Sequence, residues 1–300
     1  MTRKGRLIVL NKDENSLSFI DASDGATLAK VPVDTNPHEV AVAPDGALSY
    51  VTNSGGNTLS VIDNDKMAEV ERISHPDFKF PHGLALTPDG EYLWLAATRS
   101  DRVFVYHAPG LNLETVLPTG QSRSHMVSPN ADWSRVYVPN IGAATVTVID
   151  VARREITKHI AVGNGPEGVA VHPGGDQLYV ANQHDNNLYI MAETNHGLLT
   201  RLNLGTLPIR IAFTPDGRYA LLPNRESGDL SIIDTARRWE IKRVPTGVWP
   251  GGTVTDGDGR YAYVANNKTN DVSALDLETL REVARFGAGI HPDGMGFIPA

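Results

Sequence analysis

A unit of about 42 residues recurs along the chain and constrains its fold more than any other feature. The first landmark of each unit is a proline, replaced once by serine, and successive copies are 44, 43, 42, 42, 42 and 42 residues apart. We call this position the proline slot, and its seven copies are Pro37, Pro81, Ser124, Pro166, Pro208, Pro250 and Pro292. Sixteen residues after the first six comes the asparagine slot, occupied by Asn53, Ala97, Asn140, Asn182, Asn224 and Asn266.

Each unit has the pattern of four short strands. Runs such as "EVAVA", "LYVAN" and "DLSIID" alternate β-branched or aromatic residues with small or polar ones, and Gly, Asn, Asp and Pro separate them. No segment has a convincing helical period, which excludes architectures that alternate strands with helices. Four-stranded units of this length predict an all-β protein, a seven-bladed β-propeller with antiparallel blades.

The two ends of the chain supply complementary parts of one further blade. The segment after Pro292 contains only an innermost strand, whereas the first 33 residues contain only the other three strands, with Asn11 in the asparagine slot. The sequence therefore predicts that the ring closes by pairing the N-terminal strands with the C-terminal strand, which also protects open strand edges. We expect residues 1–300 to form one propeller domain.

Composition excludes several classes of function. The chain is 41% hydrophobic, has no long apolar run, and carries a net charge of −8 without a basic stripe, so we expect a soluble protein that binds neither membrane nor nucleic acid. It has no cysteine, which excludes thiolate metal sites. No secretion signal is recognisable, so we expect a cytoplasmic protein, or a periplasmic or secreted one if a leader has been removed. A monomer is compatible with the sequence, which does not fix the oligomeric state.

The strands before the asparagine slots resemble those of a known family. "YVTN" at Tyr50–Asn53, and "YVPN", "YVAN" and "YVAN" at 137–140, 179–182 and 263–266, together with the "PDG" and "ID" turns, are similar to the YVTN-repeat family of seven-bladed β-propellers. The resemblance covers essentially the whole chain. It implies the fold but no single activity, because similar propellers serve as surface-layer proteins, lactonases, heme-binding proteins and dehydrogenase subunits.

The residues that follow the proline slots are the candidates for chemistry. Around the ring this position reads His38, His82, His125, Glu167, Ile209, Gly251 and Asp293. Equivalent residues of all blades converge on one axis, so we expect three imidazoles and a carboxylate from adjacent blades to lie near the channel mouth. Such donors suit a divalent transition metal (Fe, Cu, Zn or Mn), and ligands confined to one side leave a coordination position open. The alternative is that these histidines are inherited repeat residues that pack between blades.

Neighbouring residues are weaker candidates. Asp293 is a candidate general base or outer-shell group, and Arg210 is a candidate for binding an anionic substrate, although a structural salt bridge explains Arg210 equally well. Arg225 and Lys268 fall in loops on the same face, where solvated polar residues are common. Trp249, just before Pro250, is a candidate wall for an apolar pocket.

These observations lead to one main hypothesis and several alternatives. The main hypothesis is a metal-dependent enzyme that acts on a small organic molecule at the channel mouth, with His38, His82, His125 and Glu167 as ligands and oxidative chemistry slightly favoured. A metal-dependent lactonase or lyase is the alternative enzyme. A protein- or glycan-binding module without catalysis, and a propeller in which one imidazole is an axial heme ligand, are the remaining alternatives.

Overall fold

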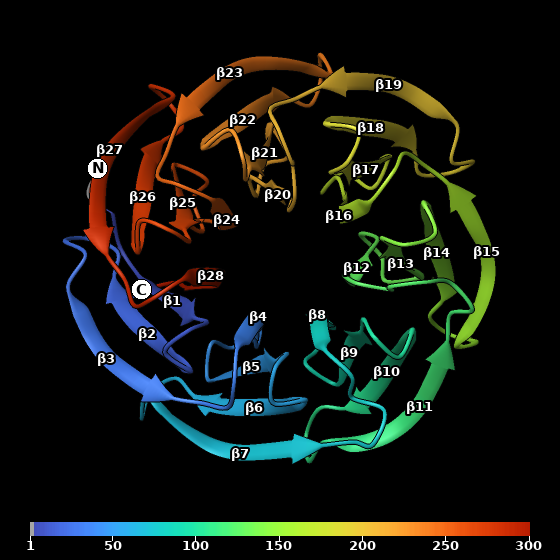
Figure 1. The fold of residues 1–300 in the computed structure, drawn as a ribbon, viewed down its shortest axis with the longest axis horizontal. Helices are drawn as coiled ribbons and strands as arrows, with labels where there is room; N and C mark the ends of the chain where they lie inside the picture. The colour runs from blue at the N-terminus through green and yellow to red at the C-terminus, as the bar shows by residue number, and fades with distance from the viewer. Residues whose placement is uncertain (1–2) are drawn as a thin grey trace.

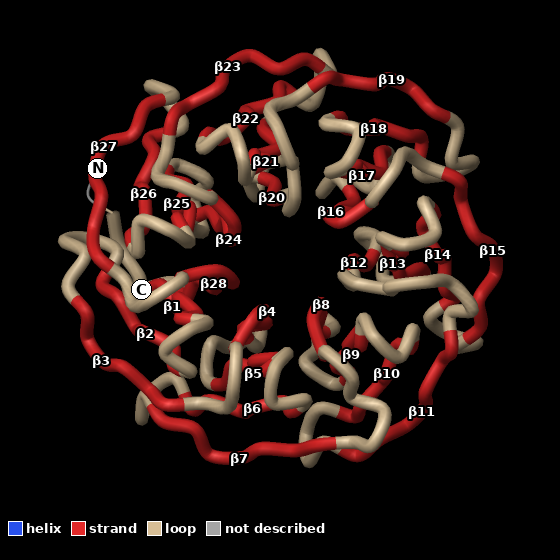
Figure 2. Tube along the Cα trace, in the orientation of Figure 1, coloured by secondary structure: helices blue, strands red, loops and turns tan. Residues whose placement is uncertain are grey.

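Seven four-stranded antiparallel sheets are arranged as blades around a central axis in the computed structural model, which describes residues 3–300 (Figure 1). The described residues contain strands, turns and loops, without helices (Figure 2). No helical segment among them has the length and apolar character needed to cross a bilayer. The predicted seven-bladed propeller is therefore confirmed.

Each blade runs from an innermost strand to an outermost one, and we number the blades in chain order. Blade 1 contains β4 (Pro37–Val42), β5 (Leu48–Asn53), β6 (Thr58–Asp63) and β7 (Ala68–Ser74); blade 2 contains β8 (Pro81–Leu86), β9 (Tyr92–Ala97), β10 (Arg102–His107) and β11 (Asn112–Pro118). Blade 3 contains β12 (Ser128–Pro129), β13 (Arg135–Asn140), β14 (Thr145–Asp150) and β15 (Glu155–Ala161); blade 4 contains β16 (Pro166–Val171), β17 (Gln177–Asn182), β18 (Asn187–Ala192) and β19 (Leu198–Asn203). Blade 5 contains β20 (Ala212–Phe213), β21 (Tyr219–Asn224), β22 (Asp229–Asp234) and β23 (Trp239–Pro245); blade 6 contains β24 (Pro250–Thr255), β25 (Tyr261–Asn266), β26 (Asp271–Asp276) and β27 (Arg281–Gly287).

Blade 7 joins the two ends of the chain. Its innermost strand is β28 (Pro292–Ile298), and its other strands are β1 (Arg6–Asn11), β2 (Ser16–Asp21) and β3 (Thr27–Pro32). β28 pairs antiparallel with β1, from Arg6 opposite Ile298 to Asn11 opposite Pro292. The predicted closure is confirmed, and it places the last proline slot opposite the asparagine slot of the N-terminal segment.

The two sequence landmarks face each other in all blades. Pro37 pairs with Asn53 and Pro166 with Asn182, and the equivalent residues pair in the other blades, including Ser124 with Asn140. Each slot asparagine is fully buried, and Asn53 shows its role by donating to Thr58 Oγ1 at 3.0 Å and Ser60 Oγ at 2.8 Å. These bonds fix the turn between the second and third strands at the face where the innermost strand begins.

The core lies between blades rather than within one. The second and third strands are almost entirely buried, whereas outermost strands such as β7 are largely exposed. Apolar side chains of adjacent blades form seven clusters; one contains Trp94 and Val103 of blade 2 together with Val136 and Ile149 of blade 3. Because a single blade buries neither face by itself, stacking around the ring supplies most of the apolar burial.

Candidate functional site

The innermost strands start at one face of the ring, and each is approached through the same backbone conformation. The residue before every proline slot has a positive φ, between 52° and 63°, which turns the chain sharply towards the axis: Asn36, Phe80, Arg123, Gly165, Leu207, Trp249 and His291. Several of these residues are bulky, so the turn is imposed by the surrounding hydrogen bonds rather than by glycine. The residues that follow the slot therefore lie at the mouth of the central channel.

A β-bulge follows the proline slot in several innermost strands. In blade 1, Pro37 pairs with Asn53 but Glu39 pairs with Thr52, so His38 is the extra residue of the bulged strand. The same displacement occurs between Pro166 and Gly168 in blade 4. A bulge breaks the simple alternation of side chains between faces. His38 and Glu39, although adjacent in sequence, both reach the axial site.

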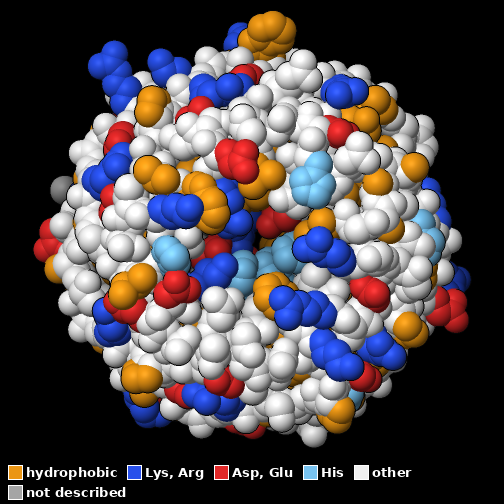
Figure 3. Space-filling view, in the orientation of Figure 1, with side chains coloured by type: hydrophobic (Ala, Val, Ile, Leu, Met, Phe, Trp, Pro, Cys, Tyr) orange, Lys and Arg blue, Asp and Glu red, His pale blue; other side chains and the backbone are white. Residues whose placement is uncertain are grey.

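Three imidazoles lie in a row around the channel mouth. The ring centroids of His38 and His82 are 4.1 Å apart, and those of His82 and His125 are 3.6 Å apart with a 29° angle between the ring planes. Figure 3 shows histidine, basic and acidic side chains gathered around the central hollow. His82, in the middle of the row, is fully buried, and neither of its ring nitrogens has a hydrogen-bond partner.

His38, Glu39 and His82 form a group that could hold a metal ion, because their ligand atoms lie within 4.8 Å of one another. Glu39 Oε1 is 3.8 Å from His38 Nδ1 and 3.9 Å from His82 Nε2. All three residues are at most 9% exposed. Two imidazoles and one carboxylate form a common donor set for catalytic zinc and for non-heme iron. We call these three residues the metal group.

His125 and Glu167 form a separate pair beside the metal group. His125 Nε2 lies 3.5 Å from Glu167 Oε1, and its Nδ1 lies 3.0 Å from the hydroxyl of Thr98. Glu167 Oε2 is buried without a hydrogen-bond partner. The four residues expected to share one ion thus divide into two contact groups, with Glu39 added to the first. A single ion held by all four remains a prediction.

Arg210 crosses the channel mouth from blade 5 to the opposite side of the ring. Its Nε donates to Glu39 Oε1 at 2.8 Å, its Nη2 also contacts Glu39, and its Nη1 is 2.8 Å from Asp293 Oδ1. Burial alone would lower the pKa of Arg210, but the carboxylates of Asp293 and Glu39 raise it further above its usual value. Arg210 is therefore a permanent cation that fixes the position of Glu39.

Asp293 is fully buried and surrounded by cations. Lys12 Nζ is 3.1 Å from Oδ2, and Arg225 Nη2 is 3.6 Å from the same oxygen. Burial by itself would raise the pKa of Asp293, but the positive charges of Arg210 and Lys12 outweigh it and hold this pKa well below its usual range. Asp293 is thus a stable carboxylate, a state that suits a role in positioning better than one in proton transfer.

Lys12 also contacts the metal group. Its ammonium lies 2.9 Å from His38 Nε2. An ammonium can only donate, so Nε2 accepts this bond, and the Nη2 of Arg210 lies 3.4 Å from the other ring nitrogen, Nδ1. Burial lowers the pKa of His38, and burial together with the neighbouring imidazoles lowers the pKa of His82 much further. Both rings are neutral near pH 7, as metal ligation requires.

The pKa of Glu167 also depends on a balance between burial and nearby polar groups. Burial alone would raise the pKa of this carboxyl, but its contact with His125 and the charge of Arg210 lower it below the usual value. The site thus holds three carboxylates, Glu39, Glu167 and Asp293, against the cations Arg210, Lys12 and Arg225.

Sequence reasoning missed Glu39 and Lys12. Both carried a signal: the second residue after the proline slot reads Glu39, Gly83, Met126, Gly168, Arg210, Gly252 and Gly294. The two charged members have opposite signs, and the structure pairs them across the channel. Lys12 occupies the position after the asparagine slot, as Arg225 does, and both reach Asp293.

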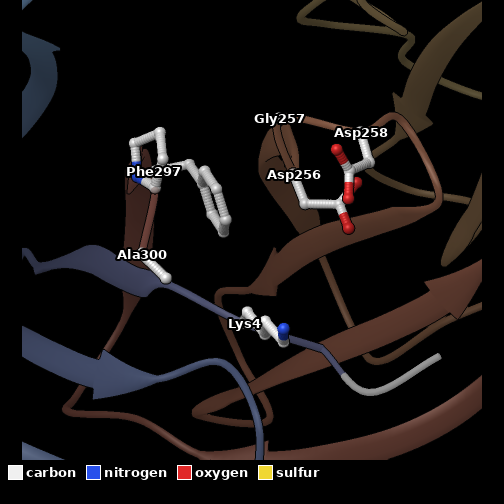
Figure 4. Close-up of a pocket in the computed structure, with 7 residues that line it drawn as sticks. Lys4, Asp256, Gly257, Asp258, Phe297 and Ala300 are labelled. Carbon is white, nitrogen blue, oxygen red and sulfur yellow. The ribbon is translucent and has the colours of Figure 1, made fainter.

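A second pocket lies far from this site. It has a volume of about 370 Å³ and is lined by Lys4, Asp256, Gly257, Asp258, Phe297, Pro299 and Ala300 (Figure 4). Asp256 to Gly259 form the turn after β24, so this pocket lies at the opposite end of the innermost strands from the metal group. Burial raises the pKa of Asp256, which accepts a bond from the backbone N–H of Tyr261 at 3.0 Å. That carboxyl is accounted for by closing its turn.

Comparison with known families gives a match over nearly the whole chain. The family model described as "Lactonase, 7-bladed beta-propeller" matches residues 4–111 and 114–282. Among curated proteins, Antigen Lp49 of Leptospira interrogans is 28% identical over 148 residues, which are 47% of this chain and 32% of that protein. Hydrazine synthase subunit beta of Kuenenia stuttgartiensis is 24% identical over 198 residues, 59% of this chain and 46% of that one. The chain therefore spans less than half the length of the curated relatives it matches.

Solved structures share the fold at low sequence identity. Hydrazine synthase of Kuenenia stuttgartiensis superimposes with a TM-score of 0.82 at 22% identity, covering 91% of this chain and 92% of that one. A functionally unknown protein from Desulfotomaculum acetoxidans gives 0.85 at 16% identity, with 99% of both chains covered. Dihydro-heme d1 dehydrogenase NirN gives 0.71 at 17% identity, with 94% of this chain and 63% of that one covered. At these identities the likeness establishes the fold alone.

Proposed function

Because the chain belongs to the family of seven-bladed β-propeller lactonases, we propose that it is a metal-dependent hydrolase of small organic molecules, with a cyclic ester as the preferred substrate class. The observation that carries the proposal is the buried metal group, in which His82 has two ring nitrogens without a hydrogen-bond partner. A buried, unsatisfied imidazole costs free energy unless a ligand completes it. His38 and Glu39 supply the remaining donors beside it.

The residues around the metal group fit the positioning roles expected there. Arg210 Nε donates to Glu39 Oε1 at 2.8 Å, and because this oxygen also faces His38 Nδ1 and His82 Nε2, the contact orients the carboxylate towards both imidazoles. Lys12 Nζ lies 2.9 Å from His38 Nε2 and 3.1 Å from Asp293 Oδ2, so it links the buried carboxylate to the metal group. Three protein ligands leave a coordination position for water or substrate. A divalent ion at this position would lower the pKa of a bound water and polarise a carbonyl.

His125 and Glu167 are suited to proton transfer beside that position. Thr98 and Glu167 contact the two ring nitrogens of His125, which fixes the orientation of the ring. The ring of His125 stacks on that of His82, with 3.6 Å between their centroids, so His125 lies next to a proposed metal ligand. In the proposed hydrolysis His125 accepts a proton from the attacking water and returns it to the leaving oxygen, while Glu167 holds the imidazole in place.

Oxidative chemistry is the second candidate, and the donor set is compatible with it. Two histidines and one carboxylate also bind Fe(II) in oxygenases, where the remaining positions receive substrate and dioxygen. The family match favours hydrolysis, whereas the ligand types are compatible with both reactions.

The proposal is tested first by metal analysis. We expect purified protein, after incubation with Zn²⁺ or Fe²⁺ and desalting, to retain about one ion per chain by mass spectrometry of the metal. His82→Ala and Glu39→Gln should each lose most of that ion, because each removes one of three ligands. His107→Ala is the matched control, since His107 lies at the end of an outer strand and pairs with Glu91.

Activity assays then separate the two reactions. Zinc-loaded protein is offered a panel of five- and six-membered lactones while released acid is titrated at constant pH, and iron-loaded protein is placed in an oxygen electrode with the same compounds. Hydrolysis that is lost in His82→Ala and retained in His107→Ala supports the first candidate. Wild-type protein that stays free of metal, with circular dichroism showing it to be folded, refutes both enzymatic candidates and favours a binding module.

A further inference from the structure

Two cations from neighbouring blades share one exposed indole beside the metal group. Lys268 Nζ lies 3.5 Å from the centre of the Trp249 ring, and the guanidinium carbon of Arg225 lies 5.6 Å from it. Arg225 follows the asparagine slot of blade 5, and Lys268 lies in the corresponding loop of blade 6. Trp249 is the residue with positive φ that leads into β24, so the three residues gather on the face that carries the axial site.

Backbone bonds fix the segment that carries this indole. The N–H of Asn267 donates to the carbonyl of Trp249 at 2.9 Å, and the N–H of Lys268 donates to that of Val248 at 3.0 Å. Trp249 nevertheless remains 36% exposed and Val248 51% exposed. A large apolar surface fixed next to a buried polar site is a feature of ligand pockets rather than of a solvated loop.

Neither cation has a good acceptor. Within residues 3–300, Lys268 forms no ion pair with a carboxylate, and the one ion pair of Arg225 is the long contact of 3.6 Å with Asp293. Arg225 Nε is buried and has no hydrogen-bond partner. Two positive charges on one aromatic ring repel each other, and an anion placed between them would remove that repulsion and satisfy the unpaired nitrogen.

Glycine at the position after Pro250 lies where this pair meets the axial site. A Cβ built on Gly251 would lie 3.2 Å from Asp293 Oδ1, 3.6 Å from Arg210 Nη1 and 3.8 Å from Arg225 Nη2. Any larger side chain would therefore occupy the space in front of both guanidinium groups. Gly251 thus lies between the cation that contacts the indole and the cation that contacts Glu39.

We propose that Arg225 and Lys268, seated on Trp249, bind a carboxylate of the substrate, and that the indole packs against an apolar ring or chain attached to it. The proposal rests on the proposed function in that it specifies which small molecule enters that site. The planar guanidinium matches a carboxylate, and the exposed indole and Val248 match an apolar body next to it. The substrate would thus be anionic at the rim and would present its reactive group to the metal group.

Benzoate, which joins a carboxylate to an apolar ring, is the probe. Binding is measured by titration calorimetry on protein treated with a chelator, so that the result does not depend on a metal. We expect millimolar affinity for wild-type protein, at least about a tenfold loss in Arg225→Gln and in Lys268→Gln, and a smaller loss in Arg225→Lys. Lys242→Gln, which removes an exposed lysine on the outer strand of blade 5, is the matched control and should bind as wild type.

Acetate and inorganic phosphate serve to test the apolar contact. Trp249→Leu should weaken benzoate several-fold and leave acetate nearly unchanged, and phosphate should bind wild-type protein more weakly than benzoate. Absence of benzoate binding, or equal binding by wild type and Lys268→Gln, overturns the proposal. Phosphate binding as tight as benzoate that Trp249→Leu does not alter also overturns it, since the site would then recognise any oxyanion. Metal content is measured separately, so either proposal can fail while the other stands.

Discussion

The ion pairs that Arg210 makes across the channel provide the sharpest test of the axial geometry. Arg210→Met keeps the length of the side chain and removes the charge that faces Glu39 and Asp293. Asp293 retains Lys12 at 3.1 Å and Arg225 at 3.6 Å, whereas Glu39 retains only the imidazoles of His38 and His82, which are neutral near pH 7. The main consequence is therefore one buried carboxylate without a counterion.

The loss of stability follows from this single unpaired carboxylate. Removing one partner of a buried ion pair destabilises a protein by about 3–5 kcal/mol. For a chain of this length 1 kcal/mol corresponds to about 2 °C, so the melting temperature of chelated protein at pH 7 should fall by about 6–10 °C. Adding Glu39→Gln removes the orphaned charge, and the double variant should recover at least half of the loss.

Scanning calorimetry of the chelated wild type, the single variant and the double variant at pH 7 measures these differences. A variant within about 1 kcal/mol of wild type at pH 7, or a double variant no more stable than the single one, would refute the reasoning.

Three further outcomes are expected. Lys12→Met should tighten zinc binding by about tenfold in a competition titration with a chromophoric chelator, because it removes a cation that donates to His38 Nε2; unchanged affinity would contradict the assignment of that contact. Asn140→Ala should lower the free energy of unfolding by about 1–3 kcal/mol in urea, since Thr145 and Thr147 lose their donor, whereas the exposed Asn112→Ala should have little effect. The pKa values of His38 and His82 are lowered by burial, so both bind protons more weakly in the folded state. Stability of the metal-free protein should therefore be full above about pH 6.5 and fall below it, with a shallower fall in His82→Asn.

The fold could be predicted because its landmarks are spaced regularly. The proline and asparagine slots lie opposite each other in the structure, and the pairing of Pro292 with Asn11 completes the ring as their positions in the sequence require. The one asparagine slot that holds another residue, Ala97, also has a physical reason. Ala97 replaces asparagine in blade 2, where Arg102 and Phe104 stand in place of the hydroxyl, amide or carboxylate acceptors used in other blades.

The site was harder to predict because it depends on departures from regularity. Side-chain alternation assigns His38 and Glu39 to opposite faces of a strand, but the bulge at the proline slot brings both to the axis. His38 and His82 were expected at the mouth and lie there in contact, whereas Glu39 was not considered. The pairing of Arg210 with Glu39 joins residues 171 positions apart, and a repeat pattern does not indicate which blades face each other through long side chains.

The strands that form the core of this molecule are different from the segments that form its candidate site. Second and third strands are buried between the blades, while the residues just beyond each proline slot lie around a shared axial space. The same blades can therefore carry different axial side chains, at a cost in stability where ion pairs join opposite blades, as they do at Arg210.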